Sequence, residues 1–88
     1  MNAFAVMIQD PEAPTYDRLN QKYDPANVYR VNKMTFLVRT KQLAEDVSVV
    51  AGIKGDERFV SGVVFKLNRY YAGYASRSLW EWLQEDEK

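Results

Sequence analysis

An α+β sandwich, in which helices cover one face of an antiparallel sheet, is the fold class that this sequence predicts. Two observations lead to it. Short apolar runs that suit strands alternate with segments of helical periodicity, and 47% hydrophobic residues in a chain of 88 supply one core. A chain of this length lies well below the size at which domains usually multiply. We therefore expect a single domain over residues 1–84, followed by an acidic, frayed tail at 85–88.

The first strand is predicted over Phe4–Ile8. Its residues FAVMI form a continuous apolar run that Asp10-Pro11 closes, which is typical of a buried central strand. A short helix follows, with Thr15 as the expected N-cap. Its apolar side chains recur at helical spacing at Tyr16, Leu19 and Tyr23.

A hairpin is predicted over Val28–Thr40. Apolar and polar residues alternate in this segment, but the parity changes near Asn32-Lys33, which indicates two strands joined by a tight turn. Thr40 is the expected N-cap of a second helix, which stops at Gly52 or Gly55. The apolar face of that helix consists of Leu43, Ala44, Val47, Val50 and Ala51.

The last strand is predicted over Phe59–Leu67. Apolar residues stand at both alternating sets of positions, so we expect both faces of this strand to be covered. A final helix opens at Ser76 or Ser78, because Ser78 and Glu81 have the spacing of a capping box. Its apolar stripe consists of Leu79, Trp82 and Leu83. The order β-α-β-β-α-β with an additional C-terminal helix is that of a ferredoxin-like sandwich.

The composition excludes several kinds of site. Neither cysteine nor histidine is present, which removes disulfides, thiolate metal sites, the usual zinc ligands and the Ser-His and Cys-His nucleophile pairs. The chain begins with an apolar run that lacks the basic segment and cleavage site of a signal peptide, and no stretch approaches the length of a membrane span. We therefore expect a cytoplasmic protein with no membrane partner.

Charge is unevenly distributed, although 12 basic and 12 acidic residues cancel. Val28–Lys41 and Arg58–Arg77 contain basic residues without an acid, and acidic residues gather at the C-terminus. Both stretches also carry aromatic residues, a mixture that holds phosphates and stacks bases. The candidates for nucleic-acid binding are Arg30, Arg39, Lys66, Arg69, Tyr70 and Tyr71. The alternative is that the cations protect sheet edges from aggregation and the tyrosines pack a dimer.

Four segments carry a resemblance to a known family, and in chain order they are FAVMIQDPEAPTYDRL, TFLVRT, ERFVSGVVFKLNRYYAGY and SLWEWL. They resemble the SinR-like small protein family, which is itself similar to the second CRISPR-associated adaptation protein, an endonuclease, and to the VapD toxins. The resemblance covers nearly the whole chain and implies a ferredoxin-like homodimer. For the CRISPR-associated and VapD branches it also implies nucleic-acid handling, whereas SinR-like members have no established activity.

Asp10 is the carboxylate that this resemblance marks. Relatives in the two nucleic-acid-handling branches place an aspartate at the end of the first strand, where it helps to hold Mg²⁺ at the dimer axis. Those relatives often carry Tyr-Asp directly at the strand end, whereas here Gln9-Asp10 is followed by Pro11. From the residues alone, an aspartate before proline is also a common turn residue.

The leading expectation is a non-catalytic, homodimeric binding or adaptor protein of the SinR-like type, with no cofactor, that contacts a protein or a nucleic acid. A homodimer is expected because the last strand lies at an edge of the predicted sheet and is apolar with few charges. The interface candidates are Phe65, Tyr74 and Trp80. The alternative is a magnesium-dependent nuclease in which Asp10 is both the catalytic residue and the metal ligand.

Overall fold

Four antiparallel strands and three α-helices make up the part of the chain that the structure, a computed structural model, describes: residues 1–68 and 77–85. The elements in chain order are β1 (Asn2–Ile8), α1 (Thr15–Lys22), the 3₁₀ turn η1 (Pro25–Asn27), β2 (Val28–Asn32), β3 (Thr35–Thr40), α2 (Ala44–Ala51), β4 (Gly62–Lys66) and α3 (Arg77–Glu85). The strand order in the sheet is β2-β3-β1-β4. The predicted α+β class and antiparallel sheet are therefore confirmed.

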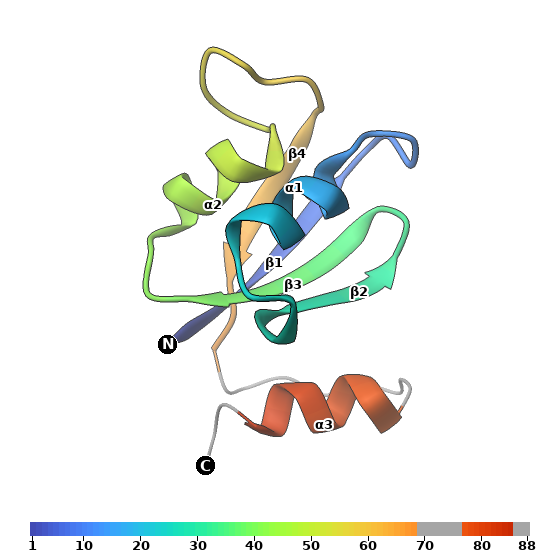
Figure 1. The fold of residues 1–88 in the computed structure, drawn as a ribbon, viewed down its shortest axis with the longest axis vertical. Helices are drawn as coiled ribbons and strands as arrows, with labels where there is room; N and C mark the ends of the chain where they lie inside the picture. The colour runs from blue at the N-terminus through green and yellow to red at the C-terminus, as the bar shows by residue number, and fades with distance from the viewer. Residues whose placement is uncertain (69–76, 86–88) are drawn as a thin grey trace.

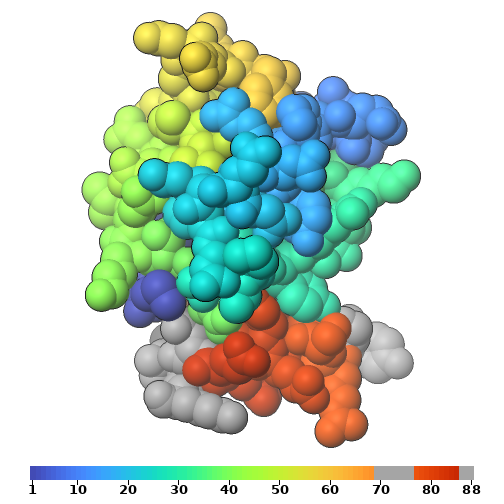
Figure 2. Space-filling model, viewed as in Figure 1, coloured from blue at the N-terminus to red at the C-terminus, as the bar shows by residue number. Residues whose placement is uncertain are grey.

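One face of the sheet is covered by α1 and α2, whereas α3 lies across one end of the molecule (Figure 1). We call the sheet face that packs against α1 and α2 the inner face, and the opposite one the outer face. Viewed from the helix side, the side chains of α1 and α2 largely hide the sheet (Figure 2). No helix in the described ranges 1–68 and 77–85 has the length and apolar character needed to cross a membrane.

The core lies between the inner face and the two helices. Alternate residues of β1, Phe4, Val6 and Ile8, are buried there, as the apolar run predicts for a central strand. Leu19 of α1 and Val47 of α2 are fully buried against them. Because β1 lies between β3 and β4, the first predicted strand is at the centre of the sheet.

The predicted hairpin is present as β2 and β3. The pairing of the two strands is irregular between Arg30 and Asn32, which explains the change of parity that the sequence shows there. The side chain of Asn32 accepts a hydrogen bond from the N–H of Met34 at 2.8 Å and so stabilises the turn.

Thr15 does not cap the first helix, contrary to expectation. Pro14 occupies the N-cap position and Thr15 is the first helical residue. The Thr15 hydroxyl is buried and donates a hydrogen bond of 2.9 Å to the carbonyl oxygen of Ala51. A side chain that could have capped its own helix therefore joins α1 to the end of α2.

Thr40 was also wrongly predicted to be an N-cap. The hydroxyl of Thr40 accepts a hydrogen bond from the N–H of Gln42, and α2 begins only after Leu43. The carboxylate of Asp46 accepts the N–H of Leu43 at 3.1 Å and caps the helix from within its first turn.

The second helix ends at Gly52, as predicted. Gly52 has a φ of 85°, the left-handed conformation that favours glycine at a helix end. A Cβ at Gly52 would also collide with the ring of Phe59. The N–H groups of Phe59 and Val60 both donate to the carbonyl oxygen of Gly52, so the predicted strand over Phe59–Leu67 is shortened to β4, which begins at Gly62.

Tyr23, just after α1, lies in a partly buried contact with the segment before α2. Its hydroxyl donates a hydrogen bond of 2.7 Å to the side-chain oxygen of Gln42. Burial, and to a smaller extent the charge of Asp46, raise the pKa of the Tyr23 phenol above its ordinary value.

The last helix has the predicted apolar stripe but not the predicted capping box. Ser78 lies inside α3 and its hydroxyl shares a hydrogen bond of 2.7 Å with that of Tyr29. The carboxylate of Glu81 accepts a hydrogen bond from Arg77 at 3.0 Å instead of reaching back to a cap. Glu85, placed by sequence in the tail, is the last residue of α3.

Candidate functional site

The outer face of the sheet carries the main candidate surface. Strand register determines which side chains share this face, because directly paired residues of neighbouring strands point to the same side. Ala5 of β1 pairs with Leu37 of β3 and with Phe65 of β4, and Leu37 also pairs with Tyr29 of β2. The outer face therefore comprises Tyr29, Asn32, Thr35, Leu37, Arg39, Ala3, Ala5, Met7, Val63 and Phe65.

On the half of the outer face formed by β2 and β3, α3 packs over the end where Tyr29 and Arg39 lie (Figure 1), and we call this half the covered half. Trp82 of α3 is 8% exposed and its ring lies 6.0 Å from that of Tyr29. The indole N–H of Trp82 donates to the carbonyl oxygen of Ala26 at 3.2 Å. The prediction that Trp82 belongs to the buried stripe of the last helix is confirmed.

Arg39 is the central polar contact of the covered half. Its guanidinium donates to the carbonyl oxygens of Trp82 and Ala26, each at 2.9 Å, and lies 4.1 Å from the centre of the Trp82 ring. A further bond of 3.3 Å reaches the carboxylate of Glu85. Only 6% of Arg39 is exposed, so this nucleic-acid candidate is used inside the fold to hold α3 on the sheet.

The half formed by β1 and β4 has a different surface, and we call it the open half. Met7, Val63 and Phe65 are 45%, 43% and 51% exposed, and Met7 pairs directly with Val63. Within the described strands β1 and β4, no charged side chain lies on this half, because Lys66 pairs with Phe4 and so belongs to the inner face. In a single copy this face of the last strand is therefore left exposed, so the expected cover for both faces would have to come from a partner.

Phe65, an interface candidate from the sequence, lies on the open half, and its strand β4 is at a sheet edge as predicted. Met7 and Val63 were missed as members of this surface. Their positions in the sequence indicate this, because side chains along a strand alternate between its two faces. Met7 alternates with the core residues of β1, and Val63 stands two residues from Phe65 on the same strand. Trp80, the candidate on α3, is partly exposed, while Tyr74 lies outside the described residues.

The basic candidates that the structure describes do not form one patch. Arg30 is on β2 and Lys66 is on β4, the two edge strands of the sheet, so three strand spacings separate them, about 14 Å. Arg30 lies instead with its guanidinium carbon 5.4 Å from the centre of the Tyr16 ring. Arg69, Tyr70 and Tyr71 lie outside the described residues.

Asp10 occupies a turn rather than a cluster of carboxylates. It is exposed in the loop after β1, where its carboxylate accepts the N–H of Glu12 at 2.9 Å and its carbonyl oxygen accepts the N–H of Ala13. In the described part of the chain, no three acidic, histidine or cysteine side chains come together. Within one copy, therefore, no cluster of carboxylates around Asp10 supplies the several oxygen ligands that Mg²⁺ takes.

Comparisons with known proteins add no relative to this picture. No family model, no curated protein and no solved structure gives a significant match to the chain.

Proposed function

We propose that the chain is a non-catalytic, homodimeric binding or adaptor protein, and that the open half of the outer face is its dimer contact. The observation that supports this most directly is the exposure of Met7, Val63 and Phe65 side by side on an uncharged part of the sheet. Apolar surface left in water costs about 25 cal/mol per Å² relative to its burial. A domain of this size buries a modest fraction of its own surface and gains from covering more.

A second copy of the chain is the partner that suits this surface. In a two-fold dimer the same patch meets itself, so a charge near the axis would face its own copy and a charge elsewhere would lose water against an apolar surface. The described strands present none on the open half, and stacking of two such halves therefore brings apolar side chains together without repulsion. The patch includes Val63 and Phe65 of the edge strand β4, and stacking of a second copy would remove these apolar side chains from water.

This proposal also includes a specific topology within the α+β class and a family relationship. We propose a ferredoxin-like sandwich with an added C-terminal helix, which the strand order β2-β3-β1-β4 and the position of α1 and α2 on one face support. The SinR-like relationship is proposed on the sequence segments that carry the resemblance.

Sedimentation analysis at increasing protein concentration tests the dimer. We expect a dimer for the wild type and a monomer for Phe65→Glu, because the variant would bury a carboxylate in the apolar contact. Val49→Glu is the matched control, since Val49 is 46% exposed on α2, away from the sheet's outer face, and should leave the dimer intact. A wild-type monomer at every concentration would refute the proposal.

Incubation with labelled RNA and DNA tests whether the chain is a nuclease. We expect no cleavage that depends on magnesium or manganese, and identical behaviour of the wild type and Asp10→Asn. Metal-dependent cleavage by the wild type that EDTA and Asp10→Asn both abolish would instead establish the nuclease.

A further inference from the structure

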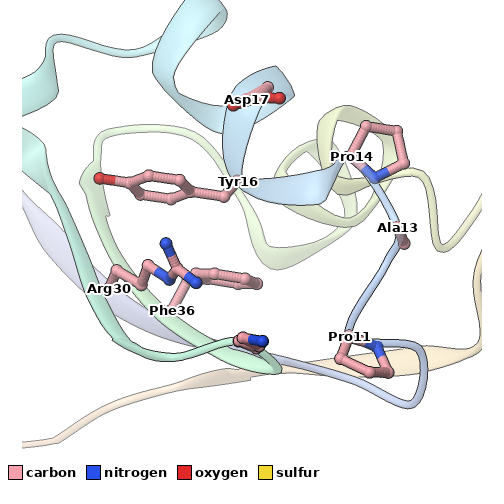
Figure 3. Close-up of a pocket in the computed structure, with 8 residues that line it drawn as sticks. Pro11, Ala13, Pro14, Tyr16, Asp17, Arg30 and Phe36 are labelled. Carbon is pink, nitrogen blue, oxygen red and sulfur yellow. The ribbon is translucent and has the colours of Figure 1, made fainter.

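A small hollow lies on the helix side of the sheet, away from the open half. It has a volume of about 150 Å³ and opens between the loop after β1, the first turn of α1 and the β2–β3 hairpin (Figure 3). Its lining consists of Pro11, Ala13, Pro14, Tyr16, Asp17, Arg30, Lys33 and Phe36. Two segments distant in sequence, residues 11–17 and 30–36, therefore meet around one concave site.

One wall of the hollow is aromatic and holds a cation. The ring of Tyr16 stacks on that of Phe36, with centroids 5.6 Å apart and an interplanar angle of 15°. Figure 3 shows Arg30 below the Tyr16 ring and beside Phe36, with Pro11 and Pro14 across the space. Cation–π contact with Tyr16 restricts the guanidinium, so less side-chain freedom is lost when it binds a ligand.

The charges in the lining favour an anion. Arg30 and Lys33 are both exposed, and neither has a carboxylate partner among the ion pairs of the described residues. Asp17 is the single acid in the lining, so two positive charges stand against one negative charge. The first turn of α1, which contributes Tyr16 and Asp17, has no side-chain cap and adds positive potential from its N–H groups.

The size and the charge of the hollow point to a phosphate. A cavity of about 150 Å³ holds one benzene-sized group, so the hollow takes a single group of a ligand while the remainder stays outside. A phosphate monoester carries a charge of about −1.5 to −2 at neutral pH and accepts several hydrogen bonds, which suits an Arg–Lys pair. A ligand with a single carboxylate would bind less strongly than a phosphate, because it carries one negative charge and Asp17 already offsets one of the two cations.

We infer that this hollow binds the terminal phosphate monoester of a nucleotide, either free or at the end of a single strand. The phosphate lies between Arg30 and Lys33, and the sugar or base rests on the apolar rim formed by Pro11 and Pro14. This inference goes beyond the proposed homodimer and does not rest on it, since the hollow and the open half lie on opposite faces of the sheet.

Titration of the ¹⁵N-labelled full chain, followed by NMR, tests the inference. The probes are a 5′-phosphorylated single-stranded oligonucleotide, the same strand without the phosphate, a free nucleoside monophosphate and a phosphoserine peptide. We expect the phosphorylated strand, the monophosphate or both to shift the amide signals of residues 12, 13, 15–17 and 30–36. The strand without the phosphate should bind at least about tenfold more weakly.

Variants of the lining make the test specific. Arg30→Gln and Lys33→Gln should each weaken binding by about tenfold, and Asp17→Asn should tighten it severalfold, because one like charge is removed. Lys41→Gln is the matched control, since Lys41 is an exposed lysine beyond the far end of β3 and should leave binding unchanged.

The choice of probe distinguishes a free nucleotide from the phosphorylated end of a single strand. Binding of the monophosphate alone supports a free nucleotide, and binding of the strand alone supports a strand end. Equal binding with and without the terminal phosphate, indifference to both Arg30→Gln and Lys33→Gln, or tighter binding of the phosphoserine peptide would overturn the inference.

Discussion

The covered and open halves of the outer sheet face differ in the contacts they offer. The covered half binds α3 through hydrogen bonds from Arg39, and the open half exposes apolar side chains. On the covered half, Arg39 joins the sheet to α3 through two carbonyl oxygens and the face of Trp82. On the open half, Met7, Val63 and Phe65 offer exposed apolar surface and no charged group from the described strands. The same sheet therefore has one half covered by its own chain and one half suited to another apolar surface.

This difference teaches how the two contacts would behave. The covered half uses directed hydrogen bonds from a guanidinium, which require α3 to sit in one position. The open half relies on non-directional apolar contact, whose strength follows the area removed from water. Single substitutions on the covered half should therefore change the stability of the folded chain. Contact through the open half should instead make stability depend on protein concentration.

Truncation of Trp82 should have the largest effect and break the covered half. We expect Trp82→Ala to lower the free energy of unfolding by about 3 kcal/mol, because it removes a buried ring and the partner of Arg39. Urea unfolding followed by circular dichroism measures this change. Gln84→Ala, an exposed change on the same helix, is the control. A loss below about 1 kcal/mol for Trp82→Ala would show that α3 contributes little to the cooperative fold.

The second prediction is that the stability of the protein depends on its concentration, because the open half is the dimer contact. If two copies stack there and unfold to monomers, each tenfold increase in concentration adds about 1.4 kcal/mol to the apparent free energy of unfolding. We expect this dependence for the wild type and for Val49→Glu, and its loss in Phe65→Glu. Unfolding curves that superimpose over the whole concentration range of the wild type would contradict a dimer.

The smallest effect is expected from the carboxylate end of the covered half. Glu85 is 3.3 Å from Arg39, but its side chain is 61% exposed, so solvent screens the ion pair. We expect Glu85→Gln to change the free energy of unfolding by less than about 0.5 kcal/mol, because Arg39 keeps its carbonyl partners. Urea unfolding at low and high salt measures it. A loss above about 1 kcal/mol would assign the docking of α3 to the ion pair.

The local elements were largely predictable because their causes lie close together in sequence. The apolar run of β1, the change of parity at the hairpin turn and the glycine after α2 all act within a few residues. The errors concern side chains with distant partners. Thr15 has the chemistry of a cap, but its hydroxyl bonds to Ala51, 36 residues away.

The candidate site shows the same limit. Arg30 and Arg39 stand in one basic stretch and are equivalent by composition. In the structure Arg30 is exposed beside Tyr16, whereas Arg39 is buried under α3. Their separation depends on a helix more than 35 residues further along the chain, and no pattern within the strands encodes where that helix docks.

The sequence by itself determined the periodicities, and with them which residues share a face of each strand or helix, because those periods follow from local backbone geometry. It also determined the chemistry that is missing, since no cysteine or histidine is present in the chain. The tertiary structure alone decided which half of the outer face α3 covers, and that Arg30 and Lys33 meet Tyr16 around one hollow. These outcomes depend on contacts between distant segments, and such contacts are set by packing of the whole chain rather than by any local preference.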